Sequence, residues 1–420
     1  MIKHRILISA VGLVISFLSA TVNLLAAREI SSEADLCAEI NALGPGDVLN
    51  LLPGEYRGPC KIRRGGKADS PIVIQAQSMT EKPRIVYAGQ DSNVFEIMAD
   101  HVTLRGLKIG PTKRNVTGVR ILARTGITVE DCEFLRLGDI AIAATRTSVN
   151  GVYVRRNLVK GSKATAMYFG CHDGVGCQIS NLVVERNFIN GVDAVDQEIG
   201  YGIQFKLNST GIISDNVIVD TKGPGIMVYG SSYPSSSNTI ERNFVSGSRN
   251  SSGILVGGGP ARVRNNIVTH NLKGGITLQD YADRGLLRKI SVVNNTLFKN
   301  DSGEFLVPLR AILSDVLFAL NAVGASKGVH AVSGLLPGLD WKQNVDCTTS
   351  ACFADPLSLN FSPISASPLS RLAKLEDAAL PFDDYYGRSR HGQLIAGAVA
   401  FAGPRIRLGI KSEGYLLKQK

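Results

Sequence analysis

The segments VERNFI at residues 184–189 and IERNFV at residues 240–245 share one pattern: an apolar residue, an asparagine three positions later, and another apolar residue two positions after that. The pattern occurs six times, with its asparagine at Asn157, Asn187, Asn216, Asn243, Asn266 and Asn295. Successive asparagines are 30, 29, 27, 23 and 29 residues apart, by subtraction of their numbers. A period in this range indicates repeated supersecondary units, each too small to bury a hydrophobic core alone.

Weaker copies extend the repeat on both sides. Residues 102–109 and 129–135 carry Gly106 and Cys132 at the asparagine position, and residues 317–323 carry Asn321. The sequence therefore predicts about nine turns. Cys132 should face the interior, where a buried thiol behaves as a small apolar group.

The composition of the units favours strands over helices. Short runs of Val, Ile and Thr alternate with Gly, Asn, Ser and Asp, and each unit holds a second apolar segment, such as TAMYFG at 165–170 or YGIQFK at 201–206. Three short strands per turn, stacked in parallel, predict an all-β fold, a single-stranded β-solenoid. Asparagine tolerates the left-handed backbone conformation and can bond the amides of neighbouring turns, so we expect an asparagine ladder.

The chain opens like an export signal. Lys3, His4 and Arg5 precede an apolar run that ends in small residues, and residues 1–27 are excluded from the fold on that ground. The alternative is an uncleaved anchor, because the run is close to the lower limit for spanning a bilayer. We expect a secreted or periplasmic protein with no stable membrane insertion after signal cleavage.

Export implies an oxidising compartment, in which cysteines pair. Of the seven cysteines, six lie in pairs that are close in sequence. The expected disulfides are Cys37–Cys60, Cys171–Cys177 and Cys347–Cys352, which leaves Cys132 as a free thiol.

These features, together with the two ends of the chain, resemble the right-handed parallel β-helix, or pectin-lyase-like, superfamily. Residues 35–62 and 70–77 resemble the opening of β-helix polysaccharide lyases of the alginate lyase and chondroitinase B type, in which a helix caps the solenoid. Residues 382–401, FDDYYGRSRHGQLIAGAVAF, resemble the closing segment of such proteins. The resemblance covers about residues 33–403.

The repeat pattern and this resemblance divide the chain into five predicted parts. They are a signal peptide (1–27), an N-terminal cap with the first turns (28–100), the β-helix repeats (101–345), a C-terminal capping segment (346–403) and a basic tail (404–420).

The lysine in YGIQFKLNST, residues 201–210, marks the candidate site. Because Ile203 and Phe205 should point inward, Gln204 and Lys206 are expected on the outer face. Tyr168 and Tyr229 come from the adjacent turns, and glycines beside Lys206 leave open space.

Long loops flank this position, and long loops beside a rigid sheet usually carry function. The loop between Cys171 and Cys177 contains His172 and Asp173, and a later loop brings Tyr233. The candidate catalytic residues are Lys206, Tyr229 and His172, and the candidate substrate-binding residues are Tyr168, Gln204, Tyr233 and Gln279. The alternative is that Lys206 is a solvated surface residue, that the tyrosines only cover the sheet, and that His172 is structural.

Three carboxylates lie close together at Asp193, Asp196 and Glu198. They could form an exposed acidic turn, or they could bind a hard cation such as calcium, the only cofactor that the sequence suggests.

The net charge is +10, which favours an acidic partner. The sequence has no basic cluster with interleaved aromatic residues, so we expect an acidic polysaccharide rather than nucleic acid. We also expect the protein to be a monomer. The resemblance implies a lyase in which a lysine acts as the base, and Lys206 matches it. Leu207 stands where the family commonly has serine. Ile199 and Tyr201 stand at the calcium-binding acids, and Tyr229 at an arginine.

Three functions remain open. A lyase or an epimerase would abstract a proton from a uronate, for which Lys206 could neutralise the carboxylate and Tyr229 could transfer protons. A glycoside hydrolase would need two opposed carboxylates, for which Asp173 and Asp196 are candidates. The third possibility is a non-catalytic glycan-binding or cell-surface protein. The residues around Lys206 favour an enzyme of the lyase type.

Overall fold

The computed structural model describes residues 27–411 except 172, 197, 325–335, 349–351, 366, 371 and 373–379. The signal segment up to residue 26, the last residues of the basic tail (412–420) and His172 therefore lie outside the described residues.

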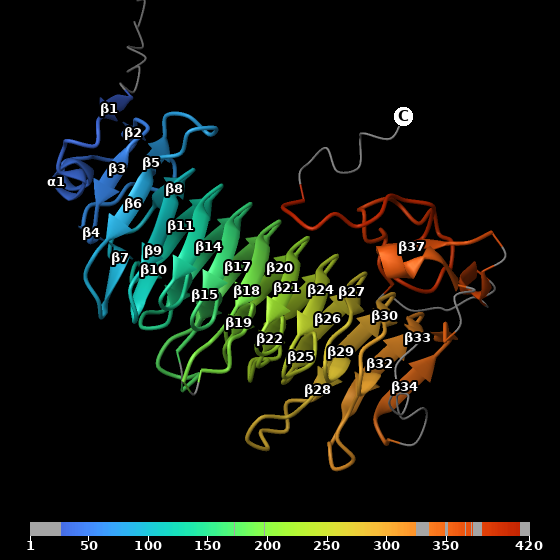
Figure 1. Cartoon of the computed structure of the whole chain (residues 1–420). Helices are drawn as coiled ribbons and strands as arrows, with labels where there is room; N and C mark the ends of the chain where they lie inside the picture. Colours follow the sequence, from blue (N-terminus) through green and yellow to red (C-terminus); the bar gives the residue numbers. More distant parts are fainter. Residues whose placement is uncertain are drawn as a thin grey trace, which may run out of the picture.

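The described strands wind into a solenoid whose successive coils each add one strand to three parallel sheets (Figure 1). Sheet A has thirteen described strands: β1 (Arg28–Ile30), β2 (Val48–Leu51), β5 (Ile72–Ala76), β8 (Val102–Arg105), β11 (Thr125–Glu130), β14 (Val149–Arg155), β17 (Ile179–Glu185), β20 (Gly211–Ser214), β23 (Asn238–Glu241), β26 (Ala261–Arg264), β29 (Arg288–Val293), β32 (Ser314–Ala319) and β34 (Leu339–Lys342).

Sheet B follows sheet A in each coil. Its twelve described strands are β3 (Glu55–Arg57), β6 (Arg84–Tyr87), β9 (Lys108–Thr112), β12 (Glu133–Leu137), β15 (Leu158–Ser162), β18 (Phe188–Val192), β21 (Val217–Thr221), β24 (Phe244–Ser248), β27 (Ile267–Thr269), β30 (Thr296–Phe298), β33 (Ala322–Gly324) and β35 (Val345–Asp346).

Sheet C completes the coil. Its ten described strands are β4 (Cys60–Ile62), β7 (Ser92–Ile97), β10 (Val116–Ile121), β13 (Ile142–Ala144), β16 (Met167–Phe169), β19 (Ile203–Phe205), β22 (Ile226–Val228), β25 (Ile254–Val256), β28 (Gly274–Leu278) and β31 (Gly303–Leu306). The all-β parallel solenoid is confirmed, but the estimate of about nine turns was too low. The coils of β2 and β5, at the N-terminal end, carry no copy of the sequence pattern. The coil of β34 holds Asn344, which accepts from Asn321 and extends the asparagine row beyond the predicted copies.

One hydrophobic core runs along the inside of the coils. Alternate residues of each strand point inward, as for Ile203 and Phe205, and the rings of Phe169 and Phe205 meet edge to face with centroids 5.7 Å apart. Cys132 is a free thiol buried in this core, and burial raises its pKa to about 12. The thiol therefore stays protonated and behaves as an apolar group.

The repeated asparagines lie in one buried row at the corner between sheets A and B. The side-chain amide of Asn157 donates to the Oδ1 of Asn187 at 3.0 Å, and Asn187 donates to Asn216 at 3.0 Å. The residue before the asparagine has the left-handed backbone conformation, as at Arg156 (φ 55°) and Arg186 (φ 54°). The expectation that the asparagine of the pattern itself takes this conformation was wrong.

Three cysteine pairs of the described chain are disulfides, Cys37–Cys60, Cys171–Cys177 and Cys347–Cys352, as predicted. The first joins helix α1 (Leu36–Asn41), at the N-terminal end of the solenoid, to β4. No helix among the described residues is long and apolar enough to cross a membrane.

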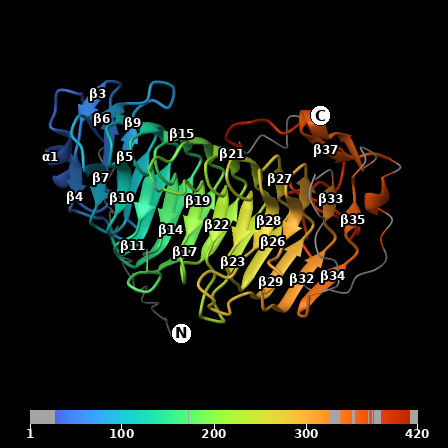
Figure 2. The same ribbon diagram turned by 60° about the horizontal axis from the view of Figure 1, so that its bottom comes forward.

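The C-terminal segment folds back along sheet B (Figures 1 and 2). It contains the antiparallel pair β36 (Phe353–Asp355) and β37 (Asn360–Pro363), and the 3-10 helices η2 (Pro356–Ser358) and η3 (Pro368–Ser370). Phe353 and Phe361 pack against Phe298 of β30, with centroids 6.0 and 5.8 Å away. The apolar cluster that it forms covers the outer face of sheet B from β18 to β33, and the candidate sites lie on sheets A and C.

Candidate functional site

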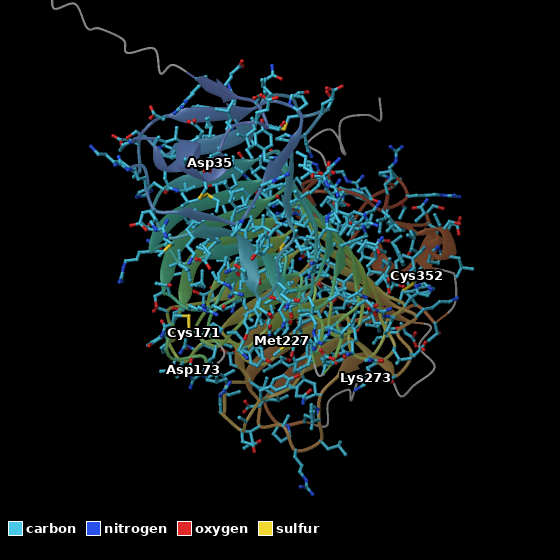
Figure 3. All side chains as sticks on the ribbon, turned by 60° about the vertical axis from the view of Figure 1, so that its left-hand side comes forward. Asp35, Cys171, Asp173, Met227, Lys273 and Cys352 are labelled. Atoms are coloured by element: carbon cyan, nitrogen blue, oxygen red, sulfur yellow. A yellow bond between two sulfur atoms is a disulfide. The ribbon has the colours of Figure 1, made fainter. Side chains whose placement is uncertain are left out.

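The candidate site lies on the outer face of sheet C. The strand register places Tyr168, Gln204, Met227, Leu255 and Thr277 in one outward row across β16, β19, β22, β25 and β28. Met227 lies near the middle of the molecule in Figure 3, with Cys171 and Asp173 to one side. The alternation of the sequence predicted this row.

Lys206 follows β19 directly, and it is 8% exposed. The alternative of a solvated surface lysine does not fit this burial. Its Nζ lies 4.2 Å from the centroid of the Tyr229 ring, which covers the side chain. Among the described residues, no carboxylate makes an ion pair with Lys206, so the ring is the partner of its ammonium.

A glycine creates the space for this lysine. Gly170, on the preceding coil, has φ of 100°, and an added Cβ would lie 2.8 Å from the Cβ of Lys206 and 2.4 Å from the Oγ of Ser209. A side chain at position 170 would therefore displace Lys206.

Tyrosines cover the outward row around Lys206. Tyr201, Met227 and Leu255 are buried together, and Tyr229 and Tyr281 pack against them. The hydroxyls of Tyr201 and Tyr229 lie 3.4 Å apart, and the rings of Tyr229 and Tyr281 have centroids 5.2 Å apart. We call Tyr168, Tyr201, Tyr229 and Tyr281 the tyrosine cluster.

Sequence reasoning missed Tyr201 and Tyr281 as parts of the site. Tyr281 comes from a loop and Tyr201 lies just before β19, so strand alternation places neither of them. The available signal was Met227 and Leu255, two large apolar residues at outward positions, which need a cover.

Three tyrosines of the cluster, Tyr168, Tyr201 and Tyr281, hold their hydroxyl protons firmly. Burial raises the pKa of Tyr168 to about 12, and the neighbouring Tyr229 and Glu198 add to the rise. Burial and then Tyr229 raise the pKa of Tyr281 to about 12, and the same two causes raise the pKa of Tyr201. These three hydroxyls therefore act as donors near neutral pH.

The remaining candidates lie in loops and have partners outside the tyrosine cluster. Tyr233 is 48% exposed, and its hydroxyl accepts a hydrogen bond from Gln178 Nε2 at 3.3 Å. Asp173 accepts from the amides of Val175 and Gly176 at 2.9 Å, within the loop closed by Cys171–Cys177. Gln279 lines a separate hollow of about 300 Å³ with Asp280 and Arg310.

The acidic loop does not gather its carboxylates. Asp193 pairs with Lys163 at 2.9 Å and Arg249 at 3.3 Å, and Asp196 pairs with Arg114 at 2.8 Å. The Lys163 ammonium lowers the pKa of Asp193. No set of three potential metal ligands occurs within the part of the chain that the structure describes. The carboxylates of Asp193 and Asp196 thus have cations as partners and do not fit a calcium site. Asp173 and Asp196 have separate partners and do not form a carboxylate pair.

Comparisons with known proteins agree with this architecture. Residues 173–315 match the family described as the right handed beta helix region. The A-module of the Azotobacter vinelandii mannuronan C-5 epimerase AlgE4 superimposes with a TM-score of 0.50 at 12% identity, covering 74% of this chain and 91% of that one. The chain is a right-handed parallel β-helix protein.

Other solved β-helix proteins are similar at lower scores. Pectate lyase Pel9A gives a TM-score of 0.48 at 15% identity, over 91% of this β-helix chain and 98% of its own. The polysaccharide lyase of family PL6 from Pseudopedobacter saltans gives 0.44 at 15% identity, over 84% and 97%. No curated protein sequence matches significantly.

Tyr201 and Tyr229 are two of the positions at which the sequence resemblance leads one to expect other residues. The structure brings these two tyrosines together, with their hydroxyls 3.4 Å apart. They form a pair beside Lys206, whose ammonium lies over the Tyr229 ring.

Proposed function

We propose that this β-helix protein is an exported lyase or epimerase that acts on an acidic, uronate-containing polysaccharide at Lys206 and the tyrosine cluster. The observation that carries the proposal is the ammonium of Lys206, which lies against Tyr229 and has no carboxylate partner among the described residues. A ligand carboxylate would supply the missing negative charge.

The chemistry needs three contributions. The uronate carboxylate must be neutralised, the proton on the adjacent carbon must be removed, and a proton must be delivered. In a lyase the proton goes to the departing glycosidic oxygen as a carbon–carbon double bond forms. In an epimerase it returns to the same carbon from the opposite face.

Each contribution has a candidate residue. The Lys206 ammonium would bind the carboxylate and stabilise the negative charge that develops in the transition state. The Tyr229 side chain, as the phenolate, would take the proton from the adjacent carbon, with Tyr201 next to it at 3.4 Å. In a lyase the phenol thus formed would give the proton to the departing oxygen, and in an epimerase solvent would supply the proton on the opposite face. Tyr168 and Tyr281, whose pKa values are raised to about 12, would donate hydrogen bonds to sugar oxygens.

Features of the scaffold support an exported protein. Three disulfides suit an oxidising compartment, outside the cytoplasm. We also infer that α1 caps the open end of the solenoid, since it buries Leu36 and Ile40, and that the asparagine row is an interior ladder.

The test is a panel of uronate polymers incubated with the mature protein. A lyase product absorbs in the ultraviolet because of its new double bond, whereas an epimerase incorporates deuterium from heavy water without cutting the chain. Lys206→Ala and Tyr229→Phe should each lose the activity found. Wild-type protein that produces neither signal on any polymer of the panel would refute the proposal.

A further inference from the structure

A hollow of about 770 Å³ lies on the outer face of sheet A and shares no lining residue with the tyrosine cluster. Its floor is formed by β26, β29, β32 and β34, which lie side by side (Figure 2). Pro234, Ser235 and Ser237, from the loop before β23, form its rim. Its volume falls in the range of ligand-binding pockets.

The outward row of sheet A changes character where this hollow begins. Over seven coils the row is uncharged and consists of Val73, Thr103, Thr128, Tyr153, Val183, Ile212 and Thr239. It continues as Arg262, Ser291, Leu317 and Asp340, all of which line the hollow. Charged side chains thus enter this row only at the hollow.

Two groups of charges on the same sheet are balanced. Glu130 is 1% exposed and accepts from Arg105 at 2.5 Å and from Arg155 at 2.6 Å. Arg264 pairs with Glu241 at 2.7 Å. Of the charged residues that line the hollow, Asp340 pairs with Lys342 at 2.5 Å, whereas Arg262, Lys289 and Asp315 make no ion pair with any residue that the structure describes. Glu29 and Glu185, elsewhere on the sheet, also make none within the described residues, so the feature particular to the hollow is that three such charges line one cavity.

We propose that this hollow is a second carbohydrate-binding site, which takes an acidic oligosaccharide. Arg262 and Lys289 are placed to receive one carboxylate, for which the planar guanidinium offers two parallel hydrogen bonds. Asp315, which lies beside Lys289 in the strand register, and Asp340, on the last strand of the floor, accept hydrogen bonds from sugar hydroxyls. Leu317, between them, offers an apolar floor for the carbon face of a sugar ring.

The repeat of the solenoid suits such a ligand. Adjacent strands are about 4.7–4.9 Å apart, close to the length of one pyranose ring, so a chain along the solenoid axis meets about one coil per sugar. Four strands then fit roughly four sugars. A site of this kind would hold one part of a polymer while another part reaches the tyrosine cluster, raising the overall affinity through linkage.

The experiment measures binding separately from catalysis. Tetra- to hexa-uronates of several compositions are titrated calorimetrically into the full mature protein carrying Lys206→Ala and Tyr229→Phe, so that the tyrosine cluster contributes little. In this background we expect saturable binding. The further double change Arg262→Ala and Lys289→Ala should raise the dissociation constant at least tenfold. Carboxyl-reduced oligomers lack the group that Arg262 and Lys289 would bind. Their dissociation constant should therefore be the same for the protein that retains these two residues and for the variant that lacks them.

A matched control removes two exposed cations elsewhere. Arg63→Ala with Arg64→Ala changes the net charge equally at the N-terminal end and should leave binding unchanged. Equal losses in the two double variants would show a general charge effect and overturn the proposal. So would the absence of binding to any oligomer of the panel, or neutral oligomers that bind as tightly as acidic ones. Because no readout uses turnover, the experiment tests this binding site independently of the proposed enzyme activity.

Discussion

Two lysines of this protein lie over tyrosine rings, and their surroundings differ. The Nζ of Lys411 is 3.6 Å from the centroid of Tyr385, and that of Lys206 is 4.2 Å from Tyr229. Lys411 also donates to the carbonyl of Arg242 at 2.5 Å and lies 3.6 Å from a carboxylate oxygen of Asp215. A buried ammonium with a balanced charge holds a segment in place, whereas one with only a ring as partner can receive an anion.

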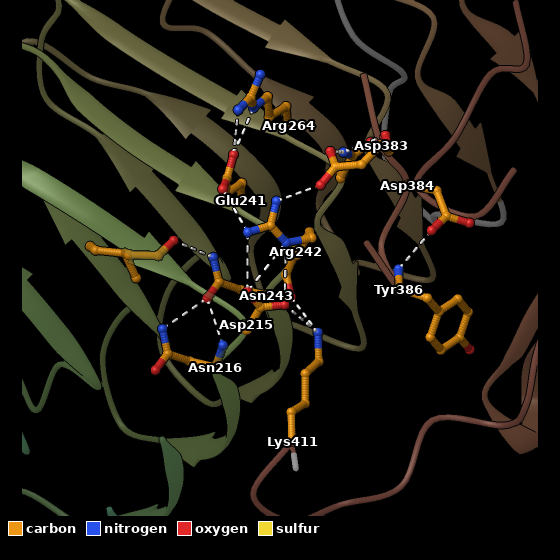
Figure 4. A network of polar contacts seen from close by, with 12 residues as sticks. Asp215, Asn216, Glu241, Arg242, Asn243, Arg264, Asp383, Asp384, Tyr386 and Lys411 are labelled. Carbon is orange, nitrogen blue, oxygen red and sulfur yellow. Dashed lines mark hydrogen bonds and ion pairs between the residues drawn. The ribbon is translucent and has the colours of Figure 1, made fainter. Parts of the chain in front are cut away.

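Lys411 belongs to a network that ties the C-terminal segment to the coils (Figure 4). Arg242, next to the asparagine row, pairs with Asp215, Glu241 and Asp383, the last at 2.7 Å. The side chain of Arg390 is buried, and its Nη2 donates to Asn265 Oδ1 at 2.8 Å. Because these charges compensate each other out of water, the loss of one leaves the others uncompensated.

The largest effect is expected from Asp215→Asn. The change removes the carboxylate that faces both Arg242 and Lys411, and it should cost about 3–5 kcal/mol of unfolding free energy, measured by denaturant titration. Asparagine tolerates the left-handed backbone at this position (φ 57°), so strain does not contribute.

The control is Asp220→Asn, which has the same backbone conformation (φ 56°). Its carboxylate is 52% exposed and pairs with Arg249 at 3.4 Å, so we expect a loss of about 1 kcal/mol or less. If both variants lose the same free energy, the network does not hold the C-terminal segment as described.

The second prediction concerns pH. Burial lowers the pKa of Lys411 to about 8, from 10.5 in the unfolded chain. Between these values the unfolded state binds more protons than the folded state, so this residue makes stability rise with pH from 8 to 10.5. The rise should be roughly 2–3 kcal/mol, and it should be absent in Lys411→Met when unfolding is followed across this window. Wild type and variant with parallel pH profiles would contradict the buried, protonated lysine.

These two sites also show how far the sequence reaches. The solenoid was predictable because its signals are local: the asparagine period, the strand composition and the alternation that placed Gln204 outward. The burial of Lys206 was not predictable, because strand alternation gives the direction of a side chain but not whether a neighbouring ring, here that of Tyr229, lies over it. The network around Lys411 was not predictable either. It joins Lys411 to Arg242, 169 positions earlier, and no periodic pattern relates the two residues.

The third prediction separates the two lysines by function. On a polymer that the wild type degrades or epimerises, Lys206→Ala should lower turnover roughly a hundredfold, because the charge that neutralises the carboxylate is gone. Stability should fall by only about 1 kcal/mol, from the lost contact with Tyr229. Lys411→Ala should show the reverse, a loss of stability with turnover unchanged at a temperature where it is folded. Equal turnover in the two variants would contradict the proposal that Lys206 acts on the substrate while Lys411 only stabilises the fold.

The smallest effect is expected from Tyr201→Phe. This change removes only the hydroxyl that faces Tyr229 at 3.4 Å and keeps the ring that packs against Met227 and Leu255. If Tyr201 positions the Tyr229 hydroxyl for proton transfer, kcat should fall about three- to tenfold while KM stays constant, since substrate is held mainly by Lys206. The control is Tyr153→Phe, which removes a hydroxyl from an exposed ring on sheet A and should leave both constants unchanged. A purely structural hydroxyl at position 201 would lower the melting temperature without changing kcat, and that result would leave Tyr229 as a cover for Lys206 rather than a group that transfers protons.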